Sequence, residues 1–300
     1  MTPPDPVRAI TARLSSAIAE NGESLDTAAK ALQGPLASAV HETGPLGQQL
    51  KDFLHGVWLG HSLHPALTDI PLGAWTAGVV FDLIGFEEAA DASLALGSLA
   101  AIPAALAGTA DWLEITDEQR RIGFVHGMLN AAALGLVVVS LGARARGRRG
   151  LGILLSTLGS SLAAVSGWLG GELVYVLGTG VSRNAFEPPA SEFQVVADAA
   201  EFRDGVLSPG RIRLDNQDVP LVLLRRGDLI LAVGGTCSHS GGPLAEGKLV
   251  ADDCVECPWH HSRFNLHDGR VQQGPATVPQ RAFEARIRDG KIEVRQKQTP

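Results

Sequence analysis

Two pairs of metal-ligand residues stand in the last quarter of the 300-residue chain. Cys237 precedes His239 by two positions, and Cys257 precedes His260 by three. A zinc finger normally pairs cysteine with cysteine and histidine with histidine, at spacings that this chain lacks. Mixed pairs suit a binuclear iron centre instead, because one iron can take both thiolates while the other takes both imidazoles. A zinc site and a scatter of buried core residues are the alternatives.

The residues around each pair narrow the kind of centre. The sequence Cys-Ser-His-Ser-Gly-Gly-Pro-Leu begins at Cys237, and Cys-Pro-Trp-His-His-Ser-Arg-Phe begins at Cys257. Both segments resemble the two ligand-binding boxes of the Rieske [2Fe–2S] family, and the resemblance extends over residues 191–298. It implies that a [2Fe–2S] cluster is held by four residues: Cys237, His239, Cys257 and His260.

Four residues in or beside the boxes have expected roles. His261 stands where the family usually has glycine, so it is expected either to crowd the loop or to offer a competing ligand, and the Cys-x-x-His spacing favours His260. Ser262 is expected to donate its hydroxyl proton to a sulfur of the cluster or of a cysteine. Phe264 is expected in the core beneath the loop, and Cys254 as a small buried hydrophobe.

The boxes also indicate a branch of the family. Rieske proteins of quinol-oxidising complexes resemble one another in carrying one further cysteine in each box, joined as a disulfide between the loops. Gly242 and Trp259 occupy those places here. The chain therefore looks more like the ferredoxin and oxygenase branch, at the low end of the ~−150 to +300 mV Rieske range. A glycine-rich dinucleotide fingerprint does not follow any expected strand, so we expect a separate protein to reduce the cluster.

The residues around the boxes alternate between apolar and polar. Phe283–Arg295 alternates on both sides of Asp289-Gly290, a dipeptide that suits a two-residue hairpin turn. Val219–Leu224 and Leu229–Val233 flank a second turn in the same way. The sequence therefore predicts an all-β antiparallel domain over residues 191–298, and we recognise no internal repeat.

The middle of the chain is apolar enough to cross a membrane. A spanning helix needs roughly 20 apolar residues. Three segments satisfy this length: Ala92–Ala110, Ile122–Ala143 and Gly150–Gly171. Pro65–Phe86 contains Asp69 and Asp82, and we count it as a fourth span with both aspartates near the interfaces. The alternative is a buried helix of a soluble bundle.

These elements predict a multidomain chain. Polar amphipathic helices are expected over residues 1–54, and an α-helical membrane bundle of four spans over residues 55–185. The all-β Rieske domain follows. The segment from His55 to Trp75, with Gly108-Thr-Ala-Asp-Trp112, resembles an uncharacterised four-helix membrane family of bacteria (DUF2231-like). Its members are sometimes fused to Rieske domains, and the resemblance implies no activity.

Ionisable residues gather at one end of the four expected spans. The candidate group is His64, Asp111, His126 and Glu172. One interpretation is a hydrogen-bonded network that fixes helix ends near the interface. The other is a haem or metal site with His64 and His126 as ligands, oriented by Asp111.

Two functions follow from these features. The first is a membrane-anchored iron–sulfur protein that carries single electrons to or from a separate reductase or other redox protein. The alternative is a component of a redox enzyme whose membrane helices hold a haem or another metal. A formal net charge of −7 argues against nucleic-acid binding, and the oligomeric state stays open.

Membrane lipid is an expected partner, and the expected location is the inner membrane of a bacterium. The loop 142–149 holds four arginines, and the opposite side also holds four basic residues, so charge does not decide the orientation. The polar N-terminal segment lacks the pattern of a cleaved signal peptide. On this ground we expect the Rieske domain on the cytoplasmic side.

Overall fold

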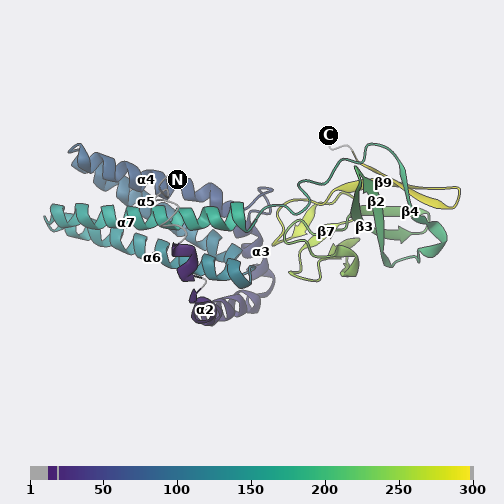
Figure 1. Cartoon of the computed structure of the whole chain (residues 1–300), viewed down its shortest axis with the longest axis horizontal. Helices are drawn as coiled ribbons and strands as arrows, with labels where there is room; N and C mark the ends of the chain where they lie inside the picture. Colours follow the sequence, from purple (N-terminus) through teal and green to yellow (C-terminus); the bar gives the residue numbers. More distant parts are fainter. Residues whose placement is uncertain (1–12, 19, 298–300) are drawn as a thin grey trace, which may run out of the picture. The chain divides into compact units, whose positions relative to one another are not determined.

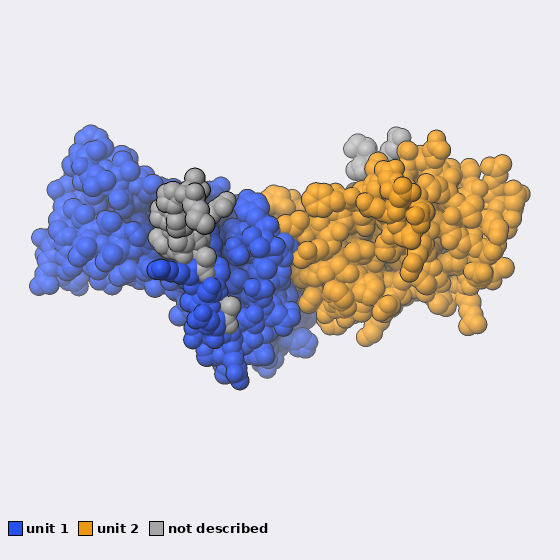
Figure 2. All heavy atoms as spheres, in the orientation of Figure 1, with its two compact units in different colours: residues 1–47, 63–179 blue, residues 48–62, 180–300 orange. Residues whose placement is uncertain are grey.

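The computed structural model describes residues 13–18 and 20–297, and it divides the chain into two compact units. The first unit contains described residues up to Gly47 and residues 63–179, and the second contains residues 48–62 and those from Gly180 onward (Figure 2). Residues 48–62 therefore group with the β domain, whereas we expected them to divide between the N-terminal helices and the membrane bundle. Residues 1–12 and 19 of the expected N-terminal helices lie outside the described residues.

The first unit is helical. Its described helices, with α3 reaching into the second unit, are α2 (Gly22–Glu42), α3 (Gly44–His55), α4 (Leu63–Leu83), α5 (Glu87–Trp112), α6 (Asp117–Ala145) and α7 (Arg149–Gly171), with a π-helical turn at Glu172–Val176. Helices α4 to α7 lie side by side as two hairpins (Figure 1). Three of them are long and apolar enough to cross a membrane: α5, α6, and α7 with the π-helical turn. Among the described residues, α4 is not counted as long and apolar enough to cross a membrane.

The two hairpins are structural repeats of each other. Adding 62 to a residue number in α4–α5 gives its equivalent in α6–α7, so Leu63–Leu83 corresponds to 125–145. The turn between the helices holds Gly85 in one hairpin and Gly147 in the other, with φ of 80° and 73°. The alternation and motifs considered in the sequence did not reveal this repeat. Few identical residues recur, and those that do are mainly glycine, serine, alanine and leucine, which are common in any apolar helix.

Small residues allow the helices of each hairpin to approach closely. A Cβ at Gly97 would lie 2.5 Å from the Trp75 ring, and a Cβ at its equivalent, Gly159, would lie 2.9 Å from the Ala133 carbonyl oxygen. Trp75 and Ala133 belong to the buried core of the bundle. Glycine is therefore needed where the helices meet, as in close helix packing generally.

A buried ion-pair network closes the end of the bundle where both hairpin turns lie. Arg144 on α6 contacts Asp82 on α4 at 2.5 Å and Asp91 on α5 at 2.9 Å. The side chains of Arg144 and Asp82 are each only 2% exposed. Arg149 adds a 2.8 Å contact to Asp82. Two of the four arginines in loop 142–149 thus have a structural role in the helical unit.

The second unit contains two antiparallel sheets. The six-stranded sheet has the order β1-β10-β9-β4-β3-β2 and consists of β1 (Gln194–Asp198), β2 (Leu207–Leu214), β3 (Gln217–Arg226), β4 (Leu229–Gly234), β9 (Ala282–Arg288) and β10 (Lys291–Gln296). The four-stranded sheet runs β5 (Lys248–Val250), β6 (Cys254–Glu256), β7 (Arg263–Asn265) and β8 (Val271–Gln273). The predicted antiparallel β domain is confirmed. Asp289-Gly290 forms the β9–β10 turn, with φ of 52° and 77°.

A buried cluster packs beneath the small sheet. Its members include Leu244, Val255, Phe264, Cys237 and Cys257, each no more than 1% exposed. The expected core position of Phe264 is confirmed. Because both cysteines belong to this cluster, the loops that carry them rest on a rigid base.

Candidate metal centre

Two hairpin-like loops carry the four candidate ligands. The first follows β4 and holds Cys237 and His239, and the second joins β6 to β7 and holds Cys257 and His260. The Cys237 N–H donates to the Gly242 carbonyl oxygen at 2.8 Å, which closes the first loop. The Cys257 N–H donates to the Ser262 carbonyl oxygen at the same distance, which closes the second.

The loops bring the four side chains together in pairs of like kind. The Cys237 thiol donates a hydrogen bond to the Cys257 sulfur, so the two sulfurs are in contact, and each cysteine is 1% exposed. The rings of His239 and His260 lie with centroids 4.9 Å apart and planes at 88°. Each loop therefore contributes one sulfur to one pair and one imidazole to the other.

The surroundings favour the protonation state that binds metal at Cys257 and at His239. The hydrogen bond from Cys237 lowers the pKa of Cys257 to about 6, and backbone N–H groups of Trp259 and His260 assist against the effect of burial. The same hydrogen bond and burial raise the pKa of Cys237. Burial, followed by the charge of His260, lowers the pKa of His239 to about 3, so this imidazole is neutral at pH 7. Thiolate and neutral imidazole are the ligand forms of these side chains.

This donor set fits a [2Fe–2S] cluster better than a single ion. Among residues 13–18 and 20–297, no three or more His, Cys, Asp or Glu side chains gather as ligands for one ion. A structural zinc site needs four such ligands around one metal. A Rieske cluster instead needs two thiolates on one iron and two imidazoles on the other, which is the pairing present here.

His261 is directed away from the ligand pair. Its backbone has φ of 60°, in the left-handed region that favours glycine, which accounts for glycine at this place in the family. The side chain is 67% exposed, and Nδ1 lies 3.2 Å from a carboxylate oxygen of Glu256. These contacts favour His260 over His261 as the ligand of the second loop.

Two further expectations concern the same loop. Cys254 is buried as expected, with its thiol directed at the Asp252 carbonyl oxygen at 3.6 Å. Ser262 is fully buried, and its Oγ accepts the Ala276 N–H at 2.9 Å. The hydroxyl proton is not used in that bond, and its donation to a sulfur stays a prediction.

Gly242 brings the two loops into contact. A Cβ at this position would lie 2.8 Å from the Cys257 sulfur and 3.2 Å from the Trp259 ring. The places where quinol-oxidising relatives carry their further cysteines are therefore adjacent. All three cysteines of this chain are free.

The segment 48–62 also packs against the β domain near the candidate ligands, and the sequence did not indicate this. The carboxylate of Asp52 accepts the Gly274 N–H at 2.9 Å. A Cβ at Gly274 would lie 3.2 Å from Val57 and 3.6 Å from His55, which is buried. The charges of His55 and Lys51 also contribute to the lowered pKa of His239. The segment precedes the helical bundle in sequence, and nothing in the two boxes signals it.

Comparison with known proteins agrees with this geometry. Residues 192–284 match the family described as Rieske [2Fe-2S] domain. Ferredoxin CarAc of Metapseudomonas resinovorans is 38% identical over 90 residues, which cover 29% of this chain and 83% of that protein. The chain belongs to the Rieske [2Fe–2S] family. Its Rieske domain therefore carries a [2Fe–2S] cluster.

Other matches show which parts of the chain are similar to known proteins. The ferredoxin subunit of anthranilate 1,2-dioxygenase from Burkholderia cepacia is 40% identical over 25% of this chain and 68% of its own length. The iron–sulfur subunit of the cytochrome b6-f complex from Chlorobaculum tepidum is 29% identical over 36% of this chain and 58% of its own length. Residues 60–183 match a different family, described as Predicted membrane protein (DUF2231). The chain of this Rieske protein is thus a fusion of the two families.

The helical unit brings together the two histidines of the second candidate group. His64 and His126 lie with ring centroids 6.1 Å apart. Asp111 and Glu172 do not join them in a metal-binding group of three or more within the described residues.

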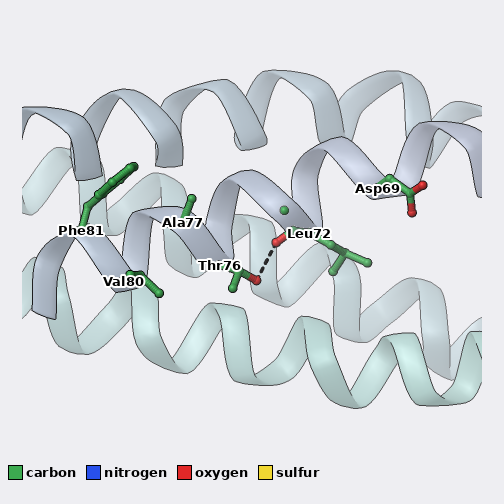
Figure 3. Close-up of a pocket in the computed structure, with 7 residues that line it drawn as sticks. Asp69, Leu72, Thr76, Ala77, Val80 and Phe81 are labelled. Atoms are coloured by element: carbon green, nitrogen blue, oxygen red, sulfur yellow. Dashed lines mark hydrogen bonds between the residues drawn. The ribbon is translucent and has the colours of Figure 1, made fainter.

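A shallow groove on the outer face of α4 also lies in this unit. Asp69, Leu72, Thr76, Val80 and Phe81 line it along one side of the helix (Figure 3). The Thr76 hydroxyl is occupied by a bond to the Leu72 carbonyl oxygen. The lining of the groove contains no cysteine or histidine, so the groove cannot hold a [2Fe–2S] cluster of the Rieske type.

Proposed function

We propose that Cys237 and Cys257 bind one iron of the cluster, that His239 and His260 bind the other, and that the chain is a membrane-anchored carrier of single electrons. The observation that carries this proposal is the pairing of the side chains. Each loop supplies one sulfur and one imidazole, and the like donors meet. Neither loop alone supplies both protein ligands of either iron.

The protein residues around the ligands have distinct tasks. The cluster supplies one-electron oxidation and reduction when bound. Backbone N–H groups of His239 and Ser240 point at the Cys237 sulfur, and those of Trp259 and His260 at the Cys257 sulfur. These donors favour added negative charge and hence the reduced state. The imidazoles are half-buried while the cysteines are buried, so the imidazole side is the route by which a partner reaches the cluster.

The partner is a separate redox protein. The similar proteins named above include a ferredoxin and a ferredoxin subunit of a dioxygenase. A ferredoxin has no substrate of its own, and the β domain of this chain has no dinucleotide fingerprint. A reductase as electron donor and an oxygenase or comparable enzyme as acceptor fit these facts.

The helical unit anchors the Rieske domain by four spans. Three helices satisfy the length and composition of a span, and we propose α4 as the fourth. Chain topology supports this count. Residues 48–62 precede α4 and residues from Gly180 follow α7, yet both belong to one compact unit joined by the bond between Asp52 and Gly274. Two parts of one folded unit lie on one side of a membrane, so an even number of spans separates them.

The side of the membrane stays a prediction. We expect the Rieske domain in the cytoplasm, where reductases of the ferredoxin kind obtain their electrons. Protease treatment of right-side-out and inverted vesicles tests this, because only inverted vesicles then expose the domain. Digestion of the domain in right-side-out vesicles would place it on the outer face.

The adjacent histidines of the second loop offer a matched pair of variants for the ligand assignment. His260→Ala should abolish the Rieske electron-paramagnetic signal of the reduced protein and lower bound iron and acid-labile sulfide. His261→Ala should keep all three, because His261 contacts Glu256 instead. The opposite result would move the ligand to His261. If both folded variants lose the signal, the cluster depends on both histidines, and the assignment of His260 alone as the ligand of this loop is wrong.

The midpoint potential tests the carrier role. Without an inter-loop disulfide, it should lie in the lower half of the ~−150 to +300 mV Rieske range. Titration followed by the paramagnetic signal measures it. A value above about +200 mV, near the upper end of that range, would favour quinol oxidation over a ferredoxin-like role.

A further inference from the structure

Two histidines occupy equivalent places in the repeated hairpins of the helical unit. His64 lies on α4 and His126 on α6, 62 residues apart, which is the spacing of the repeat. Their ring centroids are 6.1 Å apart, and the ring planes cross at 88°. The repeat thus places two imidazoles next to each other from helices that do not belong to the same hairpin.

The same backbone contact sets the tautomer of both rings. His64 Nδ1–H donates to the Ala104 carbonyl oxygen at 2.8 Å, and His126 Nδ1–H donates to the Ser166 carbonyl oxygen at 2.8 Å. A carbonyl oxygen only accepts, so Nδ1 carries the proton in each ring. In the neutral imidazole the lone pair is then on Nε2. Histidines that bind metals commonly donate their other ring N–H to a backbone carbonyl in this way.

Glycine makes room for each ring at the matching position. A Cβ at Gly108 would lie 2.7 Å from the His64 ring, and a Cβ at Gly170, its equivalent, would lie 3.3 Å from the His126 ring. Any larger residue would displace the imidazoles. Both the hydrogen bond and the glycine therefore recur together with the histidine.

The pair lies at the opposite end of the helices from the Arg144–Asp82 network. Eighteen residues separate His64 from Asp82 in α4, a rise of roughly 27 Å at 1.5 Å per residue. The hydrocarbon core of a bilayer is about 30 Å thick. The Arg144–Asp82 network thus marks one boundary and the histidines the other. Ionisable residues in such positions commonly mark a functional site.

The number of ligands limits what the pair binds. Within the described residues, no third His, Cys, Asp or Glu completes a single-ion site with them. Zinc held by protein ligands needs three or four. Two imidazoles suffice for haem iron, whose other four ligands come from the porphyrin, and for a copper ion of low coordination number.

We propose that His64 and His126 are the two protein ligands, through Nε2, of a transition-metal centre in the helical unit, either haem iron or copper. The Asn130 amide donates to His126 Nε2 at 3.2 Å, a long bond that the metal replaces. Asp111 and Glu172 have no ligand role in this site. The site is independent of the [2Fe–2S] cluster and its ligands.

The experiment uses the full chain purified in detergent, loaded separately with haemin and with copper(I). We expect one equivalent of haem, seen as a Soret band, or one equivalent of copper by elemental analysis, and the loading that succeeds identifies the metal. His64→Ala and His126→Ala should each weaken binding by at least about 100-fold, the upper end of what loss of a supporting partner costs. His61→Ala is the matched control, because that exposed histidine stands three positions before His64. The Rieske paramagnetic signal should be unchanged in every variant.

Two measurements separate a ligand from a residue that only stabilises the fold. Added imidazole should restore metal binding to His64→Gly, since a free imidazole can fill the vacated place. Asn130→Ala should bind at least as tightly as the natural chain, because it removes the competing donor. The proposal is overturned if neither metal binds, if the double variant His64→Ala, His126→Ala still binds it, or if imidazole restores nothing to a folded His64→Gly protein.

Discussion

Gly242→Ala tests whether the close approach of the two ligand loops is needed to hold the cluster. The added Cβ would lie 2.8 Å from the Cys257 sulfur and 3.2 Å from the Trp259 ring. Ordinary contacts of this kind are about 3.5–4.0 Å, so the sulfur would have to retreat by roughly 0.7–1.2 Å. Overpacking of this kind typically costs about 1–3 kcal/mol. At 1.4 kcal/mol for each factor of ten, cluster retention should fall about 5- to 150-fold.

The assay is iron and acid-labile sulfide per folded chain, together with the rate at which a chelator removes iron. Gly290→Ala is the control, because its Cβ would meet nothing within 4 Å while its φ of +77° strains the backbone. That strain costs roughly 1–2 kcal/mol, so the control loses stability at a turn far along the chain from the loops and should keep its iron. Full iron content and an unchanged chelation rate in Gly242→Ala would refute the argument from close approach.

Two other predictions concern contacts that hold each unit together. Asp52→Ala leaves the Gly274 N–H without its charged acceptor and should lower the melting temperature of the Rieske domain by about 3–12 °C, whereas Asp52→Asn keeps an acceptor oxygen and should lose less. Loss of cluster absorbance on heating measures the melting temperature of each variant. If Asp52→Ala melts at the same temperature as the natural chain, the Asp52–Gly274 hydrogen bond does not stabilise the domain. Arg144→Leu leaves Asp82 buried beside one fewer cation and should destabilise the helical unit by about 3–5 kcal/mol, while Arg144→Leu with Asp82→Leu should recover most of that loss. Thermal unfolding in detergent measures the stability of each variant. If the double variant is no more stable than Arg144→Leu alone, the ion-pair explanation is contradicted.

Local features of the chain were predictable wherever short-range chemistry decides them. Alternating residues and Asp289-Gly290 predicted the β9–β10 hairpin because side-chain period and turn chemistry are properties of neighbouring residues. The apolar lengths predicted three of the helices that could span a membrane. The assignment of Cys237, His239, Cys257 and His260 rests on spacing in the same way, and it stays a prediction that the convergence of the side chains supports.

The contacts that join distant segments were not predictable. Asp52 and Gly274 are 222 positions apart, and no local pattern indicates that one will accept a hydrogen bond from the other. The repeat of the helical hairpins escaped notice because helix packing constrains size and polarity at each position but seldom residue identity. Equivalent places hold Asp82 in one hairpin and Arg144 in the other, so some positions of the repeat differ even in the sign of their charge.

The sequence by itself determined the donor types, their spacing, the alternation of the strands and the apolar length of the helices. Only the tertiary structure decided which donors meet. His260 and His261 are equal as letters, but a left-handed backbone and Glu256 turn His261 away while His260 joins His239. His64, Asp111, His126 and Glu172 formed one candidate group, and packing places the imidazoles of His64 and His126 side by side. The physical reason is that the direction of a side chain depends on its backbone angle and on partners from other elements, which exist only once the chain has folded.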